Sequence, residues 1–324
     1  DIYMQISVII PAYNAAKYLN RCIESVANQD LPYDCYEAIV INDGSTDNSI
    51  EILDSLCEKY SFLRYITIKN QGVGCARNRG VIEAKGDYLL FLDADDSIIP
   101  NCLRVIYEEM SGYSLDLLLL NYQHIAVDGT LLLQPYHMEE NDRKVMKGRD
   151  FLFKDCYPAM IPLYVYRRKF LLDNNLKIMS IRHEDEEFVP RVLFFAQRIK
   201  YLPFCFYNYY QNIDSFMSQY QEADSLNMIK AMVSLNKFKF TCQDDALSIA
   251  YFDNHIAVIL IRLFKHSIRK GYQNQREMFM IAQEGGLFPL KPKRSSFYCR
   301  LINLSPVLFE KYYRFIKRKP KLKK

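Results

Sequence analysis

The first 120 residues alternate short apolar runs with amphipathic segments, and no other feature of the sequence constrains the fold as much. The runs have the length of strands, and the segments between them repeat their apolar residues with helical spacing. The expected strands are residues 6–10, 37–41, 63–68, 88–92 and 115–120, and the expected helices are residues 16–28, 47–59, 74–84 and 101–110. Such alternation predicts an α/β fold with a mostly parallel sheet that helices cover on both faces. Ligands of such sheets bind beyond the carboxyl ends of the strands, so the loops after the runs are the candidate sites.

The remainder of the chain is less regular and then mainly helical. It predicts a hairpin around Asp128-Gly129, helices near residues 149–154 and 186–196, and a strand near residues 199–206. Helical spacing continues from residue 223 to residue 283, until two adjacent glycines and two prolines mark a break. The chain has 324 residues and exceeds a typical domain of about 100–200 residues. We therefore expect an α/β domain over residues 1–220, a helical region over residues 221–310 and a basic, aromatic tail over residues 311–324.

Composition narrows the class of protein and the kind of metal site. Half of the residues are hydrophobic and a quarter are charged, as in ordinary globular chains. No apolar run approaches the roughly 20 residues that span a bilayer, and no signal peptide is visible, so we expect a cytoplasmic protein. The nine cysteines and five histidines are scattered without a Cys-x-x-Cys pair, which argues against a zinc site or a disulfide framework. Any bound metal is therefore expected on carboxylates.

The tail differs from the rest of the chain in charge. Residues 311–324 hold eight basic and no acidic residues, so removing those eight from the net charge of +4 leaves about −4. Aromatic residues interleave with the basic ones, a mixture that predicts contact with an anionic membrane surface. The alternative is a disordered, solubilising tail, because the aromatic positions do not form a clean helical face. Nucleic acid is not an expected partner, since the remainder is slightly acidic.

An acidic turn follows the expected strand over residues 88–92. It reads Asp93-Ala94-Asp95-Asp96, and three adjacent carboxylates repel one another unless a cation accepts their oxygens. Mg²⁺ or Mn²⁺ suits the position, because these ions often combine one or two carboxylates with substrate phosphates. The alternative is a solvated acidic turn that caps the next helix.

The loops after the first two expected strands carry other candidate contacts. Asp43, in the segment over residues 42–47, can accept hydrogen bonds from a uracil imide or a ribose hydroxyl, although a tight turn with an Asx cap is the alternative. The first strand ends in Pro11-Ala12-Tyr13-Asn14 and lacks the G-x-G-x-x-G pattern of dinucleotide sites. An NAD site is therefore not expected.

A glycine-containing connection leads to a basic segment over residues 77–79. Gly72 and Gly74 resemble part of a phosphate loop, but the next glycine is displaced and no strand immediately precedes them, so we interpret them as a flexible connection. Arg77 can pair with a phosphate through its planar guanidinium. A solvated basic helix face is the alternative.

The last acidic group opens the expected helix over residues 186–196. The segment over residues 183–188 reads HEDEEF, and acidic side chains in a first helical turn favour the helix dipole. One of these carboxylates, held beside an acceptor, can also serve as a general base.

Taken in order, five segments resemble the inverting family-2 glycosyltransferases, which have the GT-A fold, a Rossmann-like α/β fold. They are SVIIPAYN at 7–14, VINDGSTDNS at 40–49, NQGVGCARNRG at 70–80, FLDADD at 91–96 and HEDEEF at 183–188. The resemblance covers about two-thirds of the chain, from residue 6 to residue 218, and five ordered motifs are more specific than any one of them.

The resemblance implies a role for each candidate residue. Asp185 would be the catalytic base, with Glu184 supporting it, and Asp95 with Asp93 would hold Mg²⁺ or Mn²⁺. The nucleotide-sugar would contact the remaining candidates, which are Pro11, Tyr13, Asn14, Asp43, Arg77, Asn78, Asp93 and Ala94.

The implied function is metal-dependent transfer of a sugar, with inversion, from a nucleotide-sugar to an acceptor hydroxyl. By resemblance the donor is a UDP-sugar and the acceptor a glycan or a lipid-linked saccharide, in polysaccharide or glycoconjugate synthesis. Two departures from the family pattern bear on diphosphate and acceptor contacts: residues 161–168 lack a Trp-Asn pair, and Tyr210 stands where members carry an arginine.

Two other functions stay open at this point. A nucleotidyltransferase would carry a glycine-rich loop where Pro11 and Asn14 stand. A non-catalytic nucleotide-sugar-binding subunit would not need the retained Asp95 and Asp185.

Overall fold

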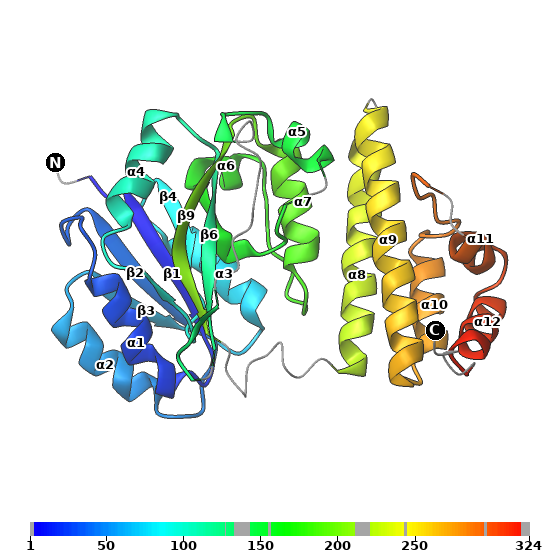
Figure 1. The fold of residues 1–324 in the computed structure, drawn as a ribbon. Helices are drawn as coiled ribbons and strands as arrows, with labels where there is room; N and C mark the ends of the chain where they lie inside the picture. Colours follow the sequence, from blue (N-terminus) through cyan, green and yellow to red (C-terminus); the bar gives the residue numbers. More distant parts are fainter. Residues whose placement is uncertain are drawn as a thin grey trace. The chain divides into compact units, whose positions relative to one another are not determined.

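The computed structural model describes residues 3–126, 128–132, 143–154, 157–210, 221–242, 245–294 and 297–318 (Figure 1). The chain divides into two compact units, Asp1–Ser218 and Gln219–Lys324. Each unit is described by itself.

The first unit is built on one mixed sheet. Its strands follow the order β3-β2-β1-β4-β8-β6-β9-β5, and β7 pairs with β6. β1, β2, β3, β4, β6 and β9 run in one direction, while β5, β7 and β8 are antiparallel to their neighbours. The strands are β1 (Ile6–Ala12), β2 (Tyr36–Asn42), β3 (Leu63–Thr67), β4 (Tyr88–Phe91), β5 (Ser97–Ile98), β6 (Leu117–Ile125), β7 (Leu131–Leu132), β8 (Tyr164–Arg167) and β9 (Ile199–Tyr210). The prediction of an α/β fold with a mostly parallel sheet is confirmed.

Helices cover both faces of this sheet, which explains the continuous apolar runs. Every residue of β1 and of β2 is buried, as expected for strands that helices enclose on both sides. In Figure 1, α1, α2 and α4 lie on one side of the sheet, and α3, α6 and α7 lie on the other. The helices of this unit are α1 (Ala16–Ala27), α2 (Ser49–Lys59), α3 (Val73–Glu83), α4 (Leu103–Gly112), α5 (Gly148–Phe153), the 3₁₀ helix η2 (Ile161–Leu163), α6 (Arg168–Asp173) and α7 (Asp185–Phe195).

Most expected elements are present, and the missed ones are short. The hairpin is confirmed, with Gly129 at a φ of 82° between β6 and β7. The sequence did not predict β5, β8 or α6, which have two, four and six residues. Segments this short carry too little periodicity to identify, and their pairing partners lie far away in the sequence.

The second unit is a group of helices around a long central one. They are α8 (Glu222–Lys239), the 3₁₀ helix η4 (Phe240–Cys242), α9 (Ala246–Lys270), α10 (Gln275–Glu284), α11 (Phe297–Leu304) and α12 (Pro306–Arg318). The predicted helical character of this region is confirmed. Asp245 caps the start of α9 by accepting from the Ser248 N–H at 3.0 Å, and Gly271 ends the helix in the left-handed conformation.

Two features of the second unit differ from the sequence prediction. By length and composition α9 could cross a membrane, although no apolar run of that length was expected; half of its most apolar stretch is buried, and it packs against α8, α10, α11 and α12 as a core helix does. α12 is a helix that begins at Pro306 and passes through residue 311, where the tail was expected to begin. Residues 319–324 of that tail lie outside the described residues.

Candidate active site

The carboxyl ends of β1, β2 and β4 meet at one edge of the sheet. Ala12 is in register with Asn42, and Ile9 with Phe91, so the loops that follow these strands are neighbours. The structure therefore gathers the motifs over residues 7–14, 40–49 and 91–96 at the edge where ligands of such sheets bind.

Asn14 ties the first of these loops to the second. Its backbone N–H donates to the Ser45 Oγ at 2.9 Å, and its side-chain Oδ1 accepts from the Thr46 N–H at 2.8 Å. Asn14 has a φ of 48°, a conformation that asparagine tolerates better than most residues. Tyr13 beside it is exposed, whereas Pro11 is buried within β1. Of these candidates, Tyr13 and Asn14 present accessible surface.

Asp43 holds the start of α3. Its carboxylate is buried and accepts from the Gln71 N–H at 2.9 Å and the Gly72 N–H at 2.8 Å. A Cβ on Gly74 would lie 2.1 Å from the Met179 carbonyl oxygen, so only glycine fits there. The flexible connection expected over Gly72 and Gly74 is instead a tightly packed, hydrogen-bonded one.

The acidic turn after β4 divides its carboxylates between two roles. Asp96 is buried and accepts from the Tyr207 O–H at 2.6 Å and the Tyr210 N–H at 2.9 Å. Burial, and then the charges of Asp95 and Asp93, raise the pKa of Asp96 well above its usual range. Asp96 thus anchors the turn to β9, while Asp93 and Asp95 stay partly exposed.

Arg77 joins the acidic turn to the start of α7. The side chain is buried, and its guanidinium donates to the Asp93 Oδ1 at 2.7 Å and to the Glu184 Oε1. Neighbouring Asn78 uses its amide on the backbone of Ile178, donating at 2.7 Å and accepting at 2.9 Å. Arg77 and Asn78 therefore hold other parts of the site together, and their contacts to a nucleotide remain predictions.

Asp185 stands at the first residue of α7. His183, at a φ of 65°, turns the chain sharply just before it, and a backbone outlier of this kind often marks a functional site. Withdrawal from water, followed by the charges of Glu184 and Glu186, raises the pKa of Asp185 to about 8. A carboxylate with such a pKa is a suitable proton acceptor near neutral pH.

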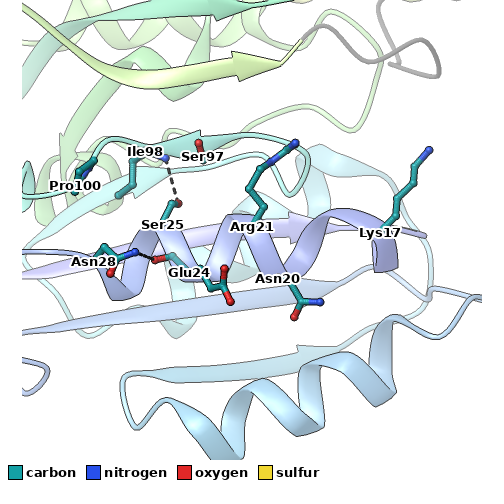
Figure 2. Close-up of a pocket in the computed structure, with 9 residues that line it drawn as sticks. All are labelled: Lys17, Asn20, Arg21, Glu24, Ser25, Asn28, Ser97, Ile98 and Pro100. Atoms are coloured by element: carbon teal, nitrogen blue, oxygen red, sulfur yellow. Dashed lines mark hydrogen bonds between the residues drawn. The ribbon is translucent and has the colours of Figure 1, made fainter. Parts of the chain in front are cut away.

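Arg21, on α1, is a site residue that the sequence did not reveal. Its guanidinium donates to the Asp95 carbonyl oxygen and lies 3.6 Å from the centre of the Tyr210 ring. Arg21 lines a hollow of about 520 Å³ between α1 and β5. Figure 2 shows it on α1 with Lys17, which lines the same hollow. In the sequence, Arg21 resembles any exposed residue of an expected helix and belongs to no motif, so sequence patterns do not identify it as a site residue.

The carboxylates present suit a metal shared with a substrate. Among the described residues, no three His, Cys, Asp or Glu side chains form a preformed metal cage. Asp93 and Asp95 nevertheless leave carboxylate oxygens partly exposed on one turn. Mg²⁺ and Mn²⁺ commonly take one or two protein carboxylates and complete their shell with phosphate and water. The residues therefore fit an ion held jointly by the turn and a diphosphate.

Comparison with known proteins agrees with this geometry. The sequence model of glycosyl transferase family 2 matches residues 7–173. The uncharacterized glycosyltransferase YibD of Escherichia coli is 30% identical over 290 residues, which cover 86% of this chain and 83% of YibD. The chain belongs to glycosyl transferase family 2, and it is a glycosyltransferase.

Solved structures share the fold. The crystal structure of S. aureus TarS 1–349 in complex with UDP-GlcNAc aligns with a TM-score of 0.74 at 23% identity, covering 97% of this chain and 90% of TarS 1–349. A mannosyltransferase from Pyrobaculum calidifontis, in complex with GDP-Man and Mn²⁺, aligns with a TM-score of 0.51 at 14% identity, covering 98% and 88%. The GT-A fold expected from the sequence is therefore confirmed.

Proposed function

We propose that the chain transfers a sugar, with inversion, from a UDP-sugar to the hydroxyl of a glycan or a lipid-linked saccharide, in a metal-dependent reaction. The observation that carries this proposal is Asp185, a carboxylate with a pKa of about 8 at the start of α7. Through Glu184 and Arg77 it adjoins the acidic turn at the ligand-binding edge of the sheet. The TarS complex with UDP-GlcNAc, which has the same fold, supports a UDP-linked donor.

Asp185 acts on the acceptor in this proposal. Its carboxylate accepts the proton of the acceptor hydroxyl while that oxygen attacks the anomeric carbon of the donor. The bond between the anomeric carbon and the phosphate oxygen breaks, and its electron pair leaves with UDP. Glu184, paired with Arg77, keeps the start of α7 in place and adds the negative charge that raises the basicity of Asp185.

Donor binding falls to the loops beyond β1, β2 and β4. The exposed Tyr13 ring and Asp43 contact the base and ribose, and Asp93 and Asp95 face the diphosphate. A bound Mg²⁺ or Mn²⁺ would supply positive charge that stabilises the departing diphosphate. The Mn²⁺ complex of the Pyrobaculum mannosyltransferase supports this assignment.

One assay tests the donor, the metal and the base together. Purified protein is incubated with a panel of UDP-sugars in Mn²⁺, in Mg²⁺ or in EDTA, and released UDP and transferred sugar are measured. We expect Asp185→Asn to bind UDP normally in calorimetry and to lose transfer by about 10²–10⁴-fold. Asp95→Ala should lose metal-dependent UDP binding. Asp173→Asn, an exposed carboxylate on α6, serves as the matched control.

Three results would contradict the proposal. Equal UDP affinity in EDTA and in Mn²⁺ would show that UDP binding needs no metal. Near-normal transfer by the Asp185→Asn variant would move the base elsewhere, with Glu184 the first alternative. Turnover of GDP-sugars but not of UDP-sugars would show that the donor is a GDP-sugar.

A further inference from the structure

Among the described residues, α12 has two apolar faces: one is buried against the second unit, and the other is mostly exposed. Phe309 and Tyr313 are buried, and their rings stack with centroids 6.0 Å apart. The Arg269 Nε on α9 donates to the Tyr313 hydroxyl at 2.8 Å. This face fixes α12 to the rest of the second unit.

The opposite face of α12 exposes large apolar side chains to solvent. Leu308, Lys311, Tyr312 and Phe315 follow the i, i+3, i+4, i+7 spacing of a single helical stripe. Phe297 on α11 extends the stripe, because its ring lies 5.0 Å from that of Tyr312. We call this surface the α11–α12 apolar face; its members and exposed fractions are Phe297 56%, Leu304 77%, Val307 59%, Leu308 48%, Tyr312 38% and Phe315 60%.

The charge around the α11–α12 apolar face is positive. Lys311 is exposed within the stripe, and Arg314 stands beside it. The single acidic residue of α12, Glu310, pairs with Arg314 at 2.8 Å, so these two charges offset each other. In the sequence, residues 317–324 hold six basic residues and no acidic residue. An apolar stripe with a basic border is complementary to an anionic lipid surface.

We propose that the α11–α12 apolar face docks on an anionic bilayer, with α12 lying in the plane of the interface. A second copy of the chain is a poor occupant, because pairing two such faces would bring two strongly basic segments together. The aromatic members, Phe297, Tyr312 and Phe315, are residues that favour the headgroup region. The docking surface therefore begins at Phe297, not at residue 311, and it excludes Tyr313, which is buried.

The chain contains no tryptophan, which permits a site-specific test of docking. Leu308→Trp places one fluorophore on the α11–α12 apolar face, and Met280→Trp places one at a similarly exposed position on α10. The full chain is titrated with vesicles of phosphatidylglycerol and phosphatidylcholine, and with vesicles of phosphatidylcholine alone. We expect a blue shift, and quenching by brominated lipid, for the tryptophan at position 308 with anionic vesicles only. The tryptophan at position 280 should change little.

Vesicle co-sedimentation separates the apolar and basic contributions. We expect Leu304→Gln with Leu308→Gln to lower the partition coefficient at least tenfold, because both side chains lose their burial in lipid. Leu247→Gln with Met280→Gln, which alters equally exposed but separate positions, is the control. Lys311→Gln should lower vesicle binding about fivefold, and this effect should be smaller at high salt. Lys230→Gln should leave vesicle binding unchanged.

Circular dichroism and UDP calorimetry verify that each variant is folded. The proposal is overturned if anionic vesicles shift neither tryptophan, or if both shift alike. It is also overturned if the Leu304→Gln, Leu308→Gln variant binds vesicles like the control. A dimer in sedimentation velocity that this variant dissociates would assign the face to a second copy instead.

Discussion

Replacing Arg77 by methionine should destabilise the first unit strongly, because Arg77 is the cation that neutralises a buried acidic site. The guanidinium is 4% exposed and pairs with Glu184, itself 9% exposed, and with Asp93. Methionine has a similar length and fills the same space, so the change removes charge and hydrogen bonds more than packing. Glu184 would be left buried and unpaired, next to Asp185 and near Asp93.

The expected cost follows from the burial of this ion pair. Removing one partner of a buried pair costs about 3–5 kcal/mol, because the other charge keeps its desolvation penalty without compensation. For a unit of this size, 1 kcal/mol corresponds to about 2–4 °C, so the melting temperature should fall by about 10 °C. Arg79→Met is the control, since Arg79 lies on the same helix, is exposed and forms a surface pair with Glu83 at 2.7 Å. Its cost should stay below about 1 kcal/mol.

Urea unfolding followed by circular dichroism, with thermal melts, provides the measurement. The double variant Arg77→Met, Glu184→Gln should recover much of the lost stability, because the unpaired carboxylate is then gone. If Arg77→Met costs no more than Arg79→Met, the pair does not stabilise the site. If Glu184→Gln fails to rescue it, the cost comes from packing and not from the buried charge.

Three further predictions concern Asp185 and Gly74. The rate of transfer by the wild type should rise with pH through a midpoint near pH 8, because only the ionised Asp185 accepts a proton. A rate independent of pH between 6 and 9 would refute this. The pKa of Asp185 is raised on folding, so its contribution to stability is present below about pH 4 and is lost as pH rises through 8. In thermal melts, the Asp185→Asn variant should therefore lose less stability than the wild type between pH 5.5 and 8.5. Gly74→Ala should lower the free energy of unfolding by about 2 kcal/mol and lower transfer, because its Cβ would meet the Met179 backbone. The control Gly112→Ala, whose Cβ would have nothing within 4 Å, should be neutral or slightly stabilising. Equal melting temperatures for the two variants would contradict the packing argument.

Several parts of the fold were accessible from the sequence because they depend on local pattern. The apolar runs over residues 6–10 and 37–41 became β1 and β2, which are buried at every position and are therefore mostly apolar. The motif around Asp93 follows β4 directly, and HEDEEF opens α7, as expected. Position relative to a strand end or a helix start is a local property, and residue order reveals it.

Which of these residues are buried in contacts within the protein, and which stay partly exposed, depends on tertiary contacts that the sequence does not reveal. Arg77 and Glu184 are 107 residues apart, so nothing local to either predicts that they form a buried pair. The three carboxylates of the acidic turn look alike in sequence, yet β9 buries Asp96 and leaves Asp93 and Asp95 partly exposed.

The same distinction applies to α12. Residue order alone shows that basic and aromatic residues alternate in the last segment, just as it shows the main strands, the motifs and their order. Packing against α9 decided that Tyr313 is buried while Leu308 is exposed. Burial is set by contacts between segments distant in sequence, and for that reason composition and spacing locate the chemical groups but do not assign their surroundings.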